Sequence, residues 1–141
     1  IIPMHGGNLR DVVNLHLFKN FYKPEFHIYD RDDNNTYEKQ AEEVNKRGNG
    51  SKAVQTSKRT MENYIHPAVI ARICGVTIEV TDDNDVVTCL CGALGKKKAE
   101  VKAILSDEVA PAMTVKEINE RDPKGEIVGW LHDIASLAEQ P

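Results

Sequence analysis

Two aspartates separated by one residue, Asp30 and Asp32, directly follow the apolar run 26–29. If that run is a buried strand of an α/β sheet, both carboxylates leave the sheet at the carboxyl end of the strand, where ligands of such sheets gather. Carboxylate oxygens are hard ligands of the kind that magnesium and manganese prefer. The pattern therefore predicts a Mg²⁺ or Mn²⁺ site at Asp30 and Asp32. Alternatively, the acidic loop caps the next helix through one of residues 33–35.

A second segment suited to chemistry, residues 56–64, follows the next expected strand and should emerge at the same edge of the sheet. A helix that begins at Thr56 or Ser57 would place Lys58 and Glu62 four residues apart on one face. Taken alone, such a pair is usually a solvent-exposed ion pair. Beside the two aspartates, however, a third carboxylate and a cation are what phosphoryl transfer requires, as a metal ligand and as positive charge for the transition state.

The first 57 residues alternate short apolar runs with helical periodicity, which is typical of a parallel α/β sheet. Strands are expected at residues 1–4, 26–29 and 52–56. Helices should connect them, the first capped by Asn8 and both with apolar residues at helical spacing. These residues are Leu9, Val12, Val13, His16 and Leu17 in the first helix, and Tyr37, Ala41 and Val44 in the second.

From residue 57 onward the pattern is mostly helical, although alternation over residues 76–80 predicts one short strand. The expected helices pass through Met61 and Tyr64, from Pro67 to Gly75, over residues 96–109, from the capping box Thr114–Glu117, and through Ile127, Trp130, Leu131, Ile134 and Ala138. We therefore expect an α/β core over residues 1–66, followed by a mostly helical extension over residues 67–141 that packs on it.

Composition limits the function classes. The 141 residues, 40% of them hydrophobic, suit one globular domain with a modest core. A net charge of −4, from 18 basic and 22 acidic residues, does not indicate a broad basic face for nucleic acid. The three cysteines lack a CxxC pair, which favours free thiols in a reducing cytoplasm over disulfides or a zinc site at Cys89 and Cys91. No apolar run is long enough to span a membrane.

The order of these motifs resembles a known family. The runs Ile2–Leu9, Phe26–Asp32 and Thr56–Tyr64, the last with its Glu-Asn-Tyr core, resemble the Toprim domain of OLD-family (overcoming lysogenization defect) ATP-dependent endonucleases. The later run Glu120–Glu126 and Trp130 are also similar to relatives of this type. The resemblance implies a Toprim-like, Rossmannoid parallel sheet with flanking helices.

The activity that the resemblance implies is a DNA endonuclease or nickase that hydrolyses phosphodiester bonds with two divalent cations, Mg²⁺ or Mn²⁺. Asp30 and Asp32 would then be metal ligands and Glu62 a ligand of the second cation. Lys58 would stabilise the charge of the transition state. Such domains usually work with an ABC-type ATPase module, in the same chain or in a separate subunit, and often serve in phage defence. A cytoplasmic homo-oligomer would fit this pattern.

The resemblance also implies a binding surface for the DNA phosphates. Gly6 and Gly7 would let the backbone approach a phosphate, and Asn8, Lys58 and Arg59 would add polar and cationic contacts. The family's first-strand glutamate should precede residue 1, so we interpret the chain as a fragment that is nearly inactive alone. It has no Walker A motif and is not expected to hydrolyse ATP itself.

Two other function classes stay open. A strand that ends in Asp30 and Asp32 also looks like the first motif of haloacid-dehalogenase-like phosphatases, in which Asp30 would be a nucleophile. Thr56, Lys58 and the run 81–83 would then supply the remaining motifs, although only 26 residues separate Asp30 from Thr56. Without its upstream glutamate, the domain could instead be a Toprim-like module that binds DNA or a partner without catalysis.

Overall fold

The computed structural model describes residues 24–34 and 36–139. The first expected strand, the first expected helix and the residues Gly6, Gly7 and Asn8 lie outside this part of the chain. Within it, the strands are β1 (Phe26–Tyr29) and β2 (Lys52–Gln55). The α-helices are α2 (Glu38–Asn45), α3 (Pro67–Cys74), α4 (Val86–Leu94), α5 (Lys98–Ile104), α6 (Val115–Arg121) and α7 (Glu126–Ala138). Shorter helical turns are η2 (Met61–Tyr64), η3 (Leu105–Val109) and η4 (Ala110–Ala112).

The two strands pair in parallel, as the sequence predicts, and α2 is the helix that connects them. Phe26 lies opposite Lys52 and Tyr29 lies opposite Gln55. Tyr29, Val44 and Ala53 form a small core between the strands and α2. Because the strands are parallel, their carboxyl ends lie at the same edge, so Asp30 and Thr56 leave the sheet as neighbours.

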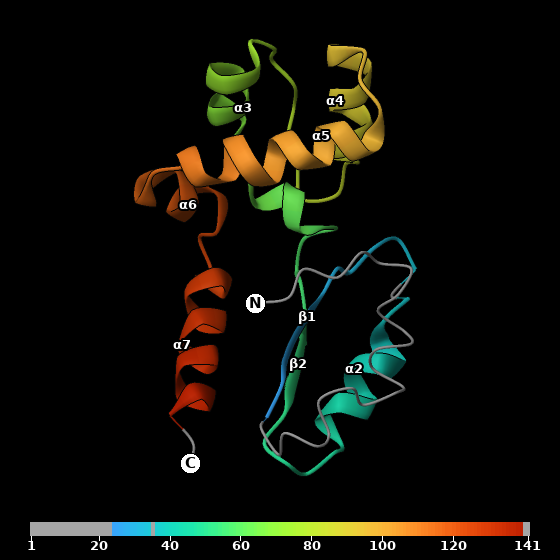
Figure 1. The fold of residues 1–141 in the computed structure, drawn as a ribbon, viewed down its shortest axis with the longest axis vertical. Coiled ribbons are helices and arrows are strands. Elements are labelled where there is room, and N and C mark those ends of the chain that lie inside the picture. Colours follow the sequence, from blue (N-terminus) through green and yellow to red (C-terminus); the bar gives the residue numbers. More distant parts are fainter. Residues whose placement is uncertain (1–23, 35, 140–141) are drawn as a thin grey trace.

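Helices α3, α4 and α5 gather at the other end of the molecule, and α7 runs alongside the strands (Figure 1). Helices α3, α4 and α5 share the larger core with η3 and the adjoining segments, and it consists of Ile65, Val69, Ile70, Val80, Val86, Val87, Leu90, Val101, Leu105 and Val109. Helix α3 begins with Pro67 and ends at Gly75, whose φ of 70° is the left-handed conformation that glycine adopts at helix ends. The expected capping box at Thr114 and Glu117 begins α6. The part of the chain that the structure describes has no helix long and apolar enough to cross a membrane.

Residues 76–80 do not form the expected strand. Burial nevertheless alternates along the segment as the sequence indicated. The side chains that pack against the helical core are Val76, Ile78 and Val80, while Thr77 and Glu79 are exposed. No strand pairs with this segment among residues 24–34 and 36–139. Alternation therefore predicted which side chains are buried, but a strand also needs a hydrogen-bonding partner, which local sequence does not reveal.

The helix expected to begin at Thr56 or Ser57 is also absent. Residues 56–60 are non-helical, and the chain enters a single 3₁₀ turn at η2. Two contacts explain this, since the Thr56 hydroxyl donates to the Lys58 carbonyl at 2.7 Å and the Arg59 N–H donates to the Asp82 carbonyl at 2.8 Å. These partners replace the first hydrogen bonds of a helix. The helix expected over residues 96–109 forms as α5, which continues into the π-helical turn η3.

Candidate functional site

Asp30 lies at the carboxyl end of β1 and reaches the start of η2, where its Oδ1 accepts a hydrogen bond from the Met61 N–H at 2.9 Å. Burial raises the pKa of Asp30 to about 6, and repulsion from the Glu62 and Asp32 carboxylates adds to the increase. The Met61 hydrogen bond and the positive charge of Lys102 act in the opposite direction. Asp30 is therefore a carboxylate surrounded by negative charge, an arrangement that favours a bound cation.

Glu62 is the second residue of η2, and its side chain is only 17% exposed. Its Oε1 lies 3.5 Å from Nζ of Lys102 on α5. The structure places Glu62 directly after Met61, whose N–H donates to Asp30, although the helix expected to carry Glu62 is absent. Its position follows from the non-helical segment 56–60, which brings η2 beside the end of β1, and not from a helix that begins at Thr56.

Asp32 has a φ of 51°, a left-handed conformation that is uncommon outside glycine and tolerated best by aspartate and asparagine. Its backbone N–H donates to the Arg59 carbonyl at 2.9 Å, which joins the loop after β1 to the segment after β2. The repulsion that Asp32 exerts on Asp30 indicates that the two carboxylates are neighbours.

Lys58 is not part of this carboxylate group. Its side chain is 7% exposed, and its ammonium group forms an ion pair with Asp82, to which Arg121 also extends, at 3.4 Å. The ammonium lies 5.3 Å from the centre of the Tyr64 ring, within the range of a cation–π contact. The hydrogen bond from Lys58 is the largest of the effects that lower the pKa of Asp82. The expectation that Lys58 and Glu62 share one helical face is therefore wrong, because residues 56–60 are non-helical.

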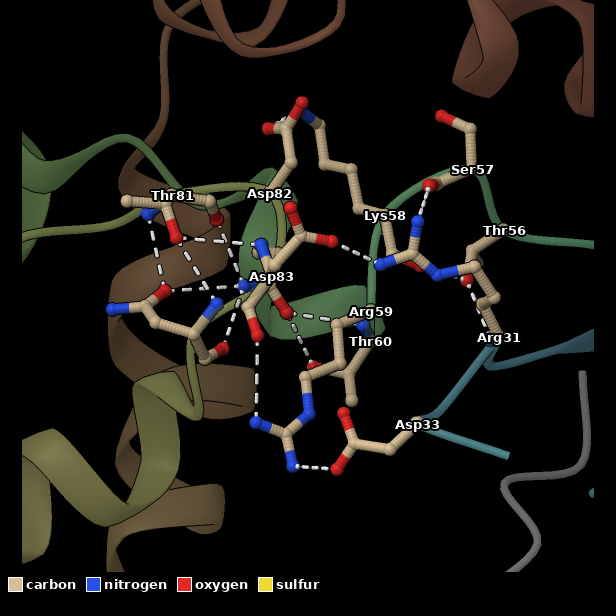
Figure 2. A network of polar contacts seen from close by, with 12 residues as sticks. Arg31, Asp33, Thr56, Ser57, Lys58, Arg59, Thr60, Thr81, Asp82 and Asp83 are labelled. Atoms are coloured by element: carbon tan, nitrogen blue, oxygen red, sulfur yellow. Dashed lines mark hydrogen bonds and ion pairs between the residues drawn. The ribbon is translucent and has the colours of Figure 1, made fainter. Parts of the chain in front are cut away.

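The residues after β1 and β2 also meet the acidic turn 81–83 (Figure 2). Arg31 forms an ion pair with Asp83 and donates to the Ser57 carbonyl at 2.8 Å. Arg59 forms an ion pair with Asp33 at 2.7 Å. The N-cap residue of α2 is Tyr37, and no side chain caps the helix, so the alternative in which residues 33–35 cap it finds no support in the described residues. Arg59, expected to contact DNA, is 23% exposed and has an acidic partner instead.

Asn63 is a central residue that the sequence analysis did not identify. It is fully buried, and its Oδ1 accepts hydrogen bonds from the Thr60 N–H at 3.0 Å and the Thr60 hydroxyl at 2.8 Å. Its amide nitrogen donates to the carbonyls of Thr81 and Asn84, both at 2.9 Å. Thr60 and Asn63 have the spacing of a capping box, with asparagine in place of glutamate. This spacing is the feature of the sequence from which the role of Asn63 could have been predicted.

The donor set suits a hard divalent cation in its chemistry, since Asp30, Asp32 and Glu62 offer carboxylate oxygens and repel one another. In the part of the chain that the structure describes, no three such side chains converge closely enough to hold an ion by themselves. Asp30 and Glu62 would hold the cation, with Asp32 beside them, and further ligands would have to come from water, substrate or other residues.

The raised pKa of Asp30, caused first by burial and then by repulsion from its neighbours, makes stability depend on pH. Its pKa is about 6 in the folded protein and 3.8 ordinarily, so its folded-state proton is bound more tightly. The resulting stabilisation is complete below pH 3.8 and is lost as the pH rises through 6. Without metal, Asp30→Asn should therefore be more stable than the parent at pH 7.5, and the difference should shrink towards pH 4.5.

Urea unfolding of the parent, Asp30→Asn and Asp107→Asn across this pH range would measure the effect. Asp107 is an exposed aspartate on η3 and serves as the control. An advantage of Asp30→Asn that does not change with pH would contradict the raised pKa of Asp30.

None of the known protein-family models, curated proteins or solved structures compared with this chain matches it.

Proposed function

We propose that this chain is the cation-binding part of a Toprim-like DNA endonuclease or nickase, in which Asp30 and Glu62 hold divalent cations and Asp32 lies beside them. The observation that carries the proposal is the placement of Asp30 and Glu62. Two segments separated in the chain by α2 and β2 deliver these carboxylates to one sheet edge, close enough for Glu62 to raise the pKa of Asp30. A cation held between the two carboxylates would explain why the fold gathers like charges there.

In phosphodiester hydrolysis, divalent cations supply an activated water and stabilise the charge that develops on the phosphate. The residues of this chain would bind the cations and orient the ligands. Asp30 and Glu62 provide fixed negative charge at the sheet edge, and the Met61 N–H orients the Asp30 carboxylate. With a net charge of −4, the chain attracts DNA poorly by itself, so cations and a partner such as an ABC-type ATPase module are part of the proposal.

Calorimetric titration with manganese tests the cation site. The parent chain should bind Mn²⁺, and Asp30→Asn should abolish detectable binding, because it removes the buried charge but keeps an oxygen that can accept from Met61. The Asp107→Asn variant should bind as the parent does. Equal binding by the parent and Asp30→Asn would remove the basis of the proposal.

One observation favours the haloacid-dehalogenase-like alternative. Lys58 and Asp82, which would belong to the later motifs of such a phosphatase, form an ion pair. Against it, the Thr56 hydroxyl accepts from the Arg31 N–H at 3.0 Å and donates to the Lys58 carbonyl, so both of its hydrogen-bonding roles serve the backbone. A beryllofluoride adduct on Asp30, detected by fluorine NMR, would favour the phosphatase. A module that binds without catalysis would take up Mn²⁺ and DNA but leave the DNA intact.

A further inference from the structure

A lysine from the helical part of the chain lies beside the carboxylates, although no sequence motif includes it. Lys102 is on α5, and its Nζ lies 3.5 Å from Oε1 of Glu62. The same ammonium group lowers the pKa of Asp30, so its charge acts on both carboxylates. Lys102 is 40 residues from Glu62 in sequence.

The fold holds Lys102 in place through its neighbours. Val101 is fully buried and Leu105 is 2% exposed, and both belong to the larger core. The α5 backbone at residue 102 is therefore fixed. The Lys102 side chain is 55% exposed and reaches Glu62 from solvent, so it can leave without disturbing the core.

We propose that Lys102 is the resident counter-ion of the Asp30–Glu62 carboxylates and is the group that an arriving divalent cation displaces. The inference rests on the proposed function. A single ammonium charge on a flexible stem partly offsets the repulsion between the carboxylates when no metal is bound. A divalent cation offsets it more fully and at shorter range, and then repels the ammonium group.

The charge of Lys102 should weaken the affinity of the site for Mn²⁺. Removing Lys102 removes the competitor and deepens the negative potential at the site, so Mn²⁺ should bind more tightly. For charges separated by several ångströms near a protein surface, the gain should be about three- to tenfold at low salt and should diminish as salt increases. A lysine that merely decorates the surface would leave the affinity unchanged.

The test is manganese calorimetry on the 141-residue chain and on the variants Lys102→Met and Lys116→Met. Methionine keeps most of the aliphatic stem and removes the charge. Lys116 is a matched control, since it is exposed and forms its own ion pair with Glu120 at 3.8 Å. The dissociation constant should fall in Lys102→Met alone, by about three- to tenfold at low salt.

Two results would overturn the inference, and they are distinguishable. Binding by the parent that requires Asp30 but is equal or weaker in Lys102→Met would overturn the role of Lys102 and leave the proposed function standing. Absence of binding in the parent and in both lysine variants would overturn the proposed function, and this inference with it.

Discussion

Replacing Glu62 with glutamine is expected to reduce manganese-dependent DNA cleavage about a hundredfold to a thousandfold, while the protein stays folded. The change removes one negative charge from a site whose chemistry depends on fixed charge at the cations. Folding should be little affected, because the Glu62–Lys102 ion pair is half exposed and such pairs contribute about 1 kcal/mol or less. Relief of the repulsion with Asp30 offsets part of that loss.

Nicking of supercoiled plasmid measures this effect best on the natural full-length protein. Manganese should be kept below the level that saturates a weakened site. Glu79→Gln is the control, since Glu79 is an exposed glutamate in the segment after α3. Near-normal cleavage by Glu62→Gln would return Glu62 to the role of a surface ion-pair partner.

Replacing Asn63 with alanine is expected to lower the free energy of unfolding by about 3 kcal/mol or more. The side chain is fully buried and its amide satisfies the Thr60 N–H and the carbonyls of Thr81 and Asn84. The Thr60 N–H would lose its acceptor in a place that water does not reach easily, and a buried unsatisfied polar group costs about 1–3 kcal/mol. The Thr81 and Asn84 carbonyls would each lose one hydrogen bond and keep a second, from Arg121 and from the Val86 N–H respectively.

Urea unfolding monitored by circular dichroism measures the loss. Asn49→Ala is a matched control, because Asn49 is exposed and its side chain accepts one hydrogen bond, from the Ser51 N–H at 3.1 Å. That variant should lose about 1 kcal/mol or less. A similar small loss in Asn63→Ala would mean that the turn at Thr81 is held by its ion pairs and not by Asn63.

The sequence predicted those elements that local rules determine. The apolar runs of β1 and β2, the connecting helix α2, the proline start and glycine end of α3, and the capping box of α6 all depend on residues within a few positions of one another. The sheet-edge placement of Asp30 followed from the same reasoning, because parallel strands joined by a helix share one carboxyl edge. The division of the chain at residue 66 stays a prediction.

The contacts that the sequence did not predict join distant segments. Lys58 pairs with Asp82 and Glu62 with Lys102, which are 24 and 40 residues away, respectively. Helical spacing suggested that Lys58 and Glu62 would share one helical face, since nothing local showed that the Arg59 N–H bonds to the Asp82 carbonyl and that residues 56–60 are non-helical. The partner of a charged residue depends on tertiary packing, which the pattern of a single sequence does not reveal.

The left-handed backbone at Asp32 determines how this position can be tested. Alanine is the usual substitute for a suspected ligand, but its Cβ disfavours a φ of 51° by about 1 kcal/mol, and it would strain the loop that donates to the Arg59 carbonyl. A loss of function in Asp32→Ala would therefore have two causes that the experiment does not separate, the missing carboxylate and a displacement of the segment that contains Arg59. Glycine and asparagine both accept this conformation, so Asp32→Gly and Asp32→Asn remove the charge and leave the loop in place. A functional difference between alanine and these two substitutes would measure the geometry of the loop separately from the charge it carries.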